Sequence, residues 1–137
     1  MTKLADKIEA LEGPSREVDA EIWAYVHGPA DCYIKQSPFN GAWCVYYTSR
    51  DGKERLCETR RGMPDKLAYT ASLDAAMTLV PEGYDWFKLR RLDRLPHMIV
   101  EPAHREGNPR DYYHFGTART PALALCAAAL RAREANR

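Results

Sequence analysis

The chain has 137 residues, of which 20 are Lys or Arg, 19 are Asp or Glu, and 45% are hydrophobic. A chain of this length fits one domain and can build a core without disulfides or metals. The balanced charge argues against broad, sequence-independent nucleic-acid binding, which depends on neutralising many phosphates. No stretch approaches 18 consecutive apolar residues, so no transmembrane helix and no membrane association are expected.

The N-terminal segment and the cysteines both favour a reducing compartment. The first six residues are polar and amphipathic and lack the apolar stretch of a signal peptide. The four cysteines have spacings that match no standard zinc pattern, and they are Cys32, Cys44, Cys57 and Cys126. We therefore expect four free thiols, mostly buried as small hydrophobes, with no metal and no cofactor.

Two helices are predicted at the start of the chain. Leu4, Ile8 and Leu11 recur at helical spacing, which predicts a short amphipathic helix from about residue 3 to 12. Ser15 is placed as the N-cap of a second helix, which Gly28-Pro29 ends near residue 27.

A strand-rich region follows, with hairpin signals at Asn40-Gly41 and Asp51-Gly52. A two-residue turn at Asp51-Gly52 predicts that Tyr47 lies opposite Leu56. The same register places Cys44 and Cys57 diagonally, roughly 7–8 Å apart, which is too far for a relaxed disulfide. If Asn40-Gly41 is also a tight turn, residues 33–39 add a third strand, and because Pro38 cannot donate to a ladder, that strand should be an edge.

The second half of the chain alternates short elements. Ser72 is the predicted N-cap of a helix that ends near residue 80, and strands are predicted at residues 84–92 and 97–100. Residues 103–116 have loop-like composition. Thr120 caps the last helix, whose Ala-rich and Leu-rich sequence extends to about residue 134.

These elements predict an α+β fold: an antiparallel sheet of about three to five strands, flanked by the N-terminal, middle and C-terminal helices. No linker divides the sequence, so residues 1–137 are interpreted as a single α/β/α sandwich-like domain. A β-hairpin insertion is predicted at about residues 32–66.

Several segments resemble small phage and prophage proteins with the phage ABA sandwich domain. The matching segments are Leu4–Ile8, Leu11–Gly13, Arg16–Asp19, Tyr69–Ala76, Val80–Trp86 and Thr120–Ala132. The resemblance implies helices flanking an antiparallel sheet, an origin in a phage genome, and action in the cytoplasm of the bacterial host. The family has no established catalytic motif, so no catalytic residue is carried over.

No catalytic constellation is found in the sequence. The four histidines are not spaced from each other or from cysteines as a metal site requires, and the acids form no paired cluster. The standard phosphate-cradling glycine loops are also absent. A Cys–His nucleophilic pair from distant residues stays open, but the sequence favours a protein that is not an enzyme.

Aromatic and basic residues interleave in two regions, around the predicted hairpin and in a late loop. Aromatic faces stack bases, and Arg pairs with phosphate, so such a set could hold a nucleotide. The candidate ligand-binding residues are Trp43, Tyr46, Arg60, Arg61, Arg110, Tyr112, Tyr113 and Arg119. The simpler interpretation, which we favour, is that the aromatics form the core face of a sheet and the arginines its solvated rim.

The exposed hairpin also suggests protein binding, since Trp, Tyr and Arg dominate interface hot spots. Edge strands pair readily with a second copy, so a homo-oligomer, most simply a dimer, is expected. The leading hypothesis is a non-enzymatic phage accessory protein, a candidate host-defence antagonist that sequesters a nucleotide signal or blocks a host protein. The alternatives are a minor virion or assembly component and a small enzyme of unknown type.

Overall fold

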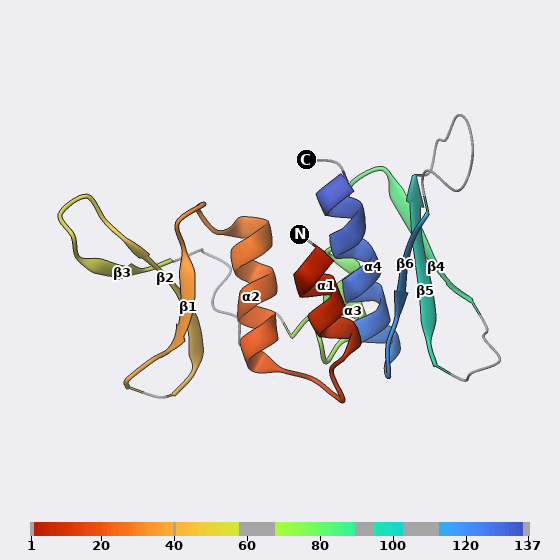
Figure 1. Ribbon diagram of the computed structural model, residues 1–137, viewed down its shortest axis with the longest axis horizontal. Helices are drawn as coiled ribbons and strands as arrows, with labels where there is room; N and C mark the ends of the chain where they lie inside the picture. Colours follow the sequence, from red (N-terminus) through yellow and green to blue (C-terminus); the bar gives the residue numbers. More distant parts are fainter. Residues whose placement is uncertain (1, 40, 58–67, 90–94, 103–112, 136–137) are drawn as a thin grey trace. The chain divides into compact units, whose positions relative to one another are not determined.

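The computed structural model describes residues 2–39, 41–57, 68–89, 95–102 and 113–135 (Figure 1). The chain forms two compact units: unit 1 comprises Met1–Pro14 and Tyr69–Arg137, and unit 2 comprises Ser15–Ala68. The predicted α+β class is confirmed, because the described residues form four helices and two antiparallel three-stranded sheets. The helices flank the sheets, as the sequence predicts.

Unit 1 is built around α4 (Pro121–Ala135), which Thr120 caps by accepting a hydrogen bond from the Leu123 N–H. Every residue from Ala122 to Leu130 is buried, and a helix that is apolar all round must be covered on all sides. It packs against β5 (His97–Pro102) and β6 (His114–Thr117), and also against α1 (Thr2–Glu9) and α3 (Leu73–Met77). Figure 1 shows α4 between α1 and the sheet.

The unit 1 sheet has the order β4-β5-β6, where β4 is Tyr84–Leu89. Gly116 lies opposite Met98, and a Cβ added to Gly116 would lie 1.9 Å from the Ala124 carbonyl oxygen. The backbones of α4 and β6 therefore touch at this glycine.

The prediction that residues 103–116 form a loop is wrong where the structure describes them, because β6 begins at His114. Residues 103–112 lie outside the described residues. A glycine in the middle of a short segment lowers its strand propensity. Here the glycine is required by the close approach of α4, which one sequence does not reveal.

Unit 2 consists of α2 (Arg16–His27) and a sheet of the order β1-β2-β3. The strands are β1 (Tyr33–Gln36), β2 (Trp43–Thr48) and β3 (Glu54–Leu56). The helix begins at the predicted N-cap, Ser15, and packs against β1 and β2. The predicted edge position of the first strand is confirmed, since β1 pairs with β2 alone among the described strands.

The hairpin between β2 and β3 differs from the prediction by one residue. Tyr47 lies opposite Arg55 rather than Leu56, and Leu56 lies opposite Tyr46. The Ser49 N–H donates to the Lys53 carbonyl, which closes a three-residue loop, and Gly52 has φ +79°, as such loops require. Because the Cys57 N–H donates to Val45, Cys57 continues the strand opposite Val45, and the predicted diagonal arrangement with Cys44 is wrong.

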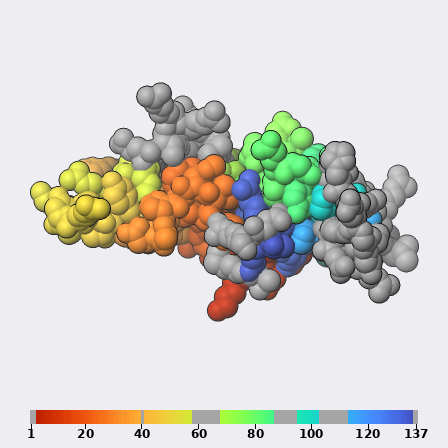
Figure 2. Space-filling view, turned by 90° about the horizontal axis from the view of Figure 1, so that it is seen from above, coloured from red at the N-terminus to blue at the C-terminus, as the bar shows by residue number. Residues whose placement is uncertain are grey.

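The side chain of Asp51 stabilises this loop. Its carboxylate accepts hydrogen bonds from the Ser49 hydroxyl, from the Lys53 N–H at 3.1 Å and from Arg55 at 3.3 Å. These bonds hold the pKa of Asp51 below its usual range; the bond from the Ser49 hydroxyl has the largest effect and the bond from the Lys53 N–H the next largest. In Figure 2 this hairpin, drawn in yellow, extends away from the orange α2 of the same unit.

We expect Gly52→Ala to destabilise unit 2 by about 1–2 kcal/mol, because a side chain in the left-handed region costs that amount. Nothing lies within 4 Å of the added Cβ, so the loss reports backbone strain and not a clash. Urea denaturation followed by circular dichroism measures it. Lys53→Ala, which truncates the exposed side chain next to Gly52, is the control and should change stability by less than about 0.5 kcal/mol.

All four cysteines are free thiols: Cys44 and Cys126 are buried, and Cys32 and Cys57 are half-buried. No helix in the described part of the chain is both long and apolar enough to span a bilayer.

Candidate binding surface

One face of the unit 2 sheet carries two tyrosines and a lysine. Tyr33 lies directly opposite Tyr46, and their rings stack at 6.2 Å between centroids and 24° between planes. The ammonium of Lys35 lies 5.0 Å from the centroid of the Tyr46 ring, within the range of a cation–π interaction. We call the set Tyr33, Lys35, Tyr46 and Glu54 the tyrosine face.

Glu54 connects these residues from β3. Its carboxylate accepts a hydrogen bond from the Tyr33 hydroxyl and pairs with the Lys35 ammonium. The hydrogen bonds from Lys35 and, to a smaller extent, from Tyr33 hold the pKa of Glu54 below its usual range. Glu54 in turn raises the pKa of both partners. The side chains of Lys35 and Glu54 are 44% and 38% exposed, and Tyr33 is 36% exposed. The tyrosine face is thus solvent-facing, aromatic and internally neutralised.

The predicted site residues of unit 2 do not act together. Trp43 and Tyr46 are three positions apart on β2, so alternation places them on opposite faces of the sheet. Tyr46 belongs to the tyrosine face, whereas Trp43 does not. The sequence prediction missed Tyr33, Lys35 and Glu54, the actual neighbours of Tyr46.

The other predicted site residues lie elsewhere. Tyr113 and Arg119 belong to unit 1, where the Tyr113 ring contacts Phe115 edge-on at 6.1 Å and Arg119 is exposed. Four further candidates, Arg60, Arg61, Arg110 and Tyr112, lie outside the described residues. The described residues therefore show Trp43 and Tyr46 in one unit and Tyr113 and Arg119 in the other.

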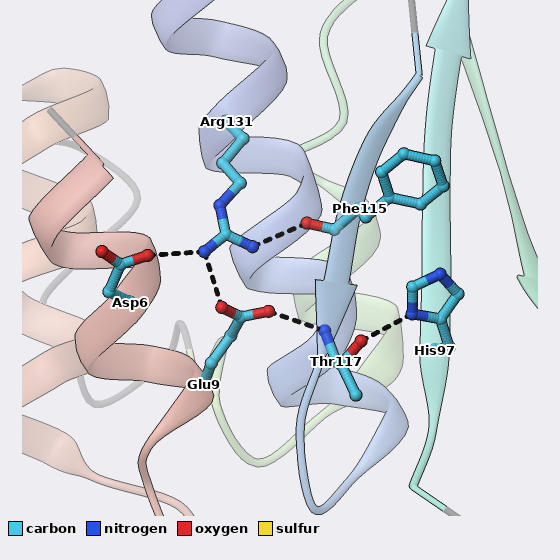
Figure 3. A network of polar contacts seen from close by, with 6 residues as sticks. All are labelled: Asp6, Glu9, His97, Phe115, Thr117 and Arg131. Carbon is cyan, nitrogen blue, oxygen red and sulfur yellow. Dashed lines mark hydrogen bonds and ion pairs between the residues drawn. The ribbon is translucent and has the colours of Figure 1, made fainter. Parts of the chain in front are cut away.

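A polar network in unit 1 connects α1, α4 and the sheet (Figure 3). The Arg131 guanidinium donates to Asp6 and to Glu9, both at 2.6 Å, and to the Phe115 carbonyl at 2.7 Å. Glu9 also accepts a hydrogen bond from the Thr117 N–H at 2.8 Å. Burial alone would raise the pKa of Glu9, but Arg131 and the Thr117 N–H outweigh it and hold that pKa below its usual range.

This network completes the outer edge of β6. The Ala118 N–H donates to Pro96, so alternation directs the backbone groups of Phe115 and Thr117 away from β5. Glu9 and Arg131 occupy one donor and one acceptor there, as a neighbouring strand would. The arrangement is a structural edge cover.

His97 extends the same network without forming a catalytic group. Its Nδ1 lies 2.5 Å from the Thr117 hydroxyl, and its ring stacks on Phe115 at 5.4 Å. The histidine is buried on β5 directly opposite Thr117. A cross-strand His–Thr hydrogen bond of this kind satisfies a buried polar group.

The described residues offer little for catalysis or metal binding. Among them no group of three or more His, Cys, Asp or Glu side chains could hold a metal ion. Burial raises the pKa of the Cys32 and Cys57 thiols, which disfavours the thiolate that a nucleophile needs.

Comparisons with protein-family models, with curated proteins and with solved structures found no match to this chain.

Proposed function

We propose that this chain is a small phage or prophage accessory protein that acts without catalysis, by binding and blocking a protein of the bacterial host. The binding surface is the tyrosine face of unit 2. The observation that carries this proposal is the stack of the exposed Tyr33 on the half-buried Tyr46, beside the Lys35–Glu54 pair.

Residue chemistry favours a protein partner. Tyrosine supplies a large, rigid contact area together with a hydroxyl and is enriched among residues that dominate interface energies. Three elements of the unit hold the two rings in place: β1, β2 and the Glu54 carboxylate on β3. Such a preorganised surface loses little side-chain entropy on association.

The same geometry disfavours a nucleotide signal as the ligand. A phosphate requires donors or cations that are free to pair with it. Lys35, the cation of the tyrosine face, is engaged by Glu54. Arg55 lies opposite Tyr47, on the other face of the sheet, and pairs with Asp51 at 3.3 Å. A phosphate would have to displace a carboxylate to reach either charge.

The phage origin and the location in the host cytoplasm follow from the family resemblance of the sequence. Two matching segments, Tyr69–Ala76 and Thr120–Ala132, form the start of α3 and most of α4. These positions cap helices and fill the core of unit 1, so they carry the fold, whereas the proposed binding surface lies in unit 2.

The test is affinity capture from bacterial lysate with the immobilised chain, followed by mass spectrometry. We expect one host protein to be retained, and Tyr33→Ala to weaken its binding about 30-fold, as for a hot-spot residue. The matched control is Arg50→Ala, an exposed residue of the β2–β3 loop, which should bind as the wild type does. Equal capture by both variants would remove the tyrosine face from the proposal.

Native mass spectrometry with linear and cyclic nucleotides tests the competing function. The blocking proposal predicts no stoichiometric mass shift with any nucleotide. A stoichiometric shift would contradict it and favour signal sequestration, and the same spectra report whether the chain is a dimer.

A further inference from the structure

The outer edge of β1 carries backbone groups that face away from β2. The Ser37 N–H donates to the Ala42 carbonyl, and in an antiparallel ladder every second residue bonds to the same neighbour. Tyr33 and Lys35 therefore bond to β2, while the N–H and C=O groups of Ile34 and Gln36 are directed outward. Within the described part of the chain, no strand pairs with this edge.

The edge of β6 in unit 1 provides a contrast. There Glu9 and Arg131 occupy an outward N–H and an outward carbonyl. No comparable side-chain cover on Ile34 or Gln36 is found among the described residues, where the Gln36 amide donates instead to the Gly41 carbonyl at 3.2 Å. Among the described residues, side chains cover the β6 edge, and none covers the outward groups of β1.

Two exposed aromatic residues border this edge. Tyr33 begins β1 and is 36% exposed, and Phe39 follows β1 in the loop to β2 and is 96% exposed. An almost fully exposed phenylalanine costs solubility. A chain running along β1 would have an aromatic contact available at each end.

We propose that β1 accepts an extended peptide segment of the protein partner as a fourth strand of the unit 2 sheet. This inference rests on the proposed function and names how the partner binds. Ile34 and Gln36 each offer one outward N–H and one outward C=O. These groups repeat every second residue, about 6.6–6.8 Å apart, which is the spacing of the groups on another strand. Strand addition of this type takes its affinity from main-chain hydrogen bonds and its specificity from alternate side chains.

Charge indicates that the occupant is a different chain and not a second copy. The symmetric antiparallel register that pairs Ile34 with Gln36 of the other copy places the two Lys35 side chains directly opposite each other. Each Lys35 is already paired with its own Glu54, so a second copy would bring two such ion pairs face to face, and an edge lysine is a common defence against self-pairing. A partner strand with an uncharged residue opposite Lys35 and an apolar residue against Tyr33 avoids this crowding and leaves the Lys35–Glu54 pair intact.

The experiment uses a displayed library of random peptides of roughly twelve residues as the probe, long enough to cover β1 and the loop to Phe39. Selected peptides should bind the wild-type chain and bind Gln36→Pro at least tenfold more weakly. Proline removes the outward N–H but leaves the bonds to β2 intact, and it is tolerated on edge strands. Gln36→Thr is the matched control, since it loses the same side chain but keeps the N–H, and its affinity should stay within twofold of wild type.

N-methylation of the best peptide, one residue at a time, provides the second readout. Binding should fall at every second position, where the peptide N–H points at β1, and persist at the positions between. The proposal is overturned if no peptide is selected, if Gln36→Pro binds normally, or if the methylation pattern does not alternate. It is also overturned if the chain forms a dimer that Gln36→Pro dissociates, because a second copy would then occupy the edge.

Failure here is distinguishable from failure of the proposed function. A captured host protein that depends on Tyr33 but binds Gln36→Pro normally would keep the tyrosine face and remove strand addition. Peptides that bind the edge without any captured host protein would do the reverse.

Discussion

Gly116→Ala is expected to cost unit 1 about 3 kcal/mol or more, the upper end of the usual range for overpacking. The added Cβ would lie 1.9 Å from the Ala124 carbonyl oxygen and 2.8 Å from the Ala128 N. Both atoms belong to the backbone of α4, so no side-chain rotation relieves the clash. The helix must move away from β6, which opens the core around Leu123 to Leu130.

Chemical denaturation followed by far-ultraviolet circular dichroism measures this loss against total stabilities of roughly 5–15 kcal/mol for a domain. Gly13→Ala is the matched control, because nothing lies within 4 Å of its added Cβ. It should change stability by less than about 0.5 kcal/mol. A loss below about 1 kcal/mol for Gly116→Ala would mean that α4 does not press on β6 as described.

The same glycine explains why β6 was missed from the sequence. His114–Thr117 has four residues with a glycine among them, and local propensity gives such a segment little strand character. Its strand conformation depends on pairing with β5 and on the contact with α4, and both partners are distant in the chain. Helices, by contrast, were predictable because their caps are local: Ser15, Ser72 and Thr120 each accept a hydrogen bond from the residue three positions later.

Loop length decided which parts of the unit 2 sheet could be predicted. A change of one residue in a hairpin loop reverses the face that each side chain shares with its neighbour. The predicted two-residue loop at Asp51-Gly52 is a three-residue loop, so Leu56 shares a face with Tyr46 and not with Tyr47. The β1–β2 loop differs in length from a two-residue turn by an even number of residues. Tyr33 and Tyr46 therefore share a face both in the predicted register and in the observed one.

The candidate site was predictable only in part for the same reason. Tyr46 was identified from the mixture of aromatic and basic residues, but sequence proximity grouped it with Trp43, on the opposite face. Its true neighbours come from β1 and β3 and are set by register, and Lys35 reads in the sequence as an ordinary surface lysine. The strand predicted at residues 33–39 could have revealed two of them. Pairing that strand with the one that contains Tyr46 places Tyr33 and Lys35 on the same face as Tyr46.

Arg131→Met is expected to destabilise unit 1 by about 2–3 kcal/mol. Breaking a fully buried pair costs about 3–5 kcal/mol, and solvent reduces this figure because the Arg131 and Glu9 side chains are 23% and 25% exposed. The substitution leaves the Phe115 carbonyl without its donor and the Glu9 carboxylate without its cation. Arg119→Met makes the same chemical change at an exposed position of the same unit and should cost less than about 0.5 kcal/mol.

The pH dependence of that difference separates the ion pair from simple packing. The folded-state pKa of Glu9 lies below its usual value, so its ionised form adds stability that is fully present above the unfolded pKa of about 4.3. That contribution is lost as the pH falls through the lower folded-state value. In Arg131→Met only the Thr117 N–H still opposes the effect of burial, so the folded-state pKa of Glu9 moves up from its wild-type position and this acid-dependent loss becomes smaller. The stability difference between wild type and Arg131→Met should therefore shrink between pH 7 and pH 3. A constant difference across that range would show that Arg131 acts through its hydrogen bond to the Phe115 carbonyl and not through Glu9.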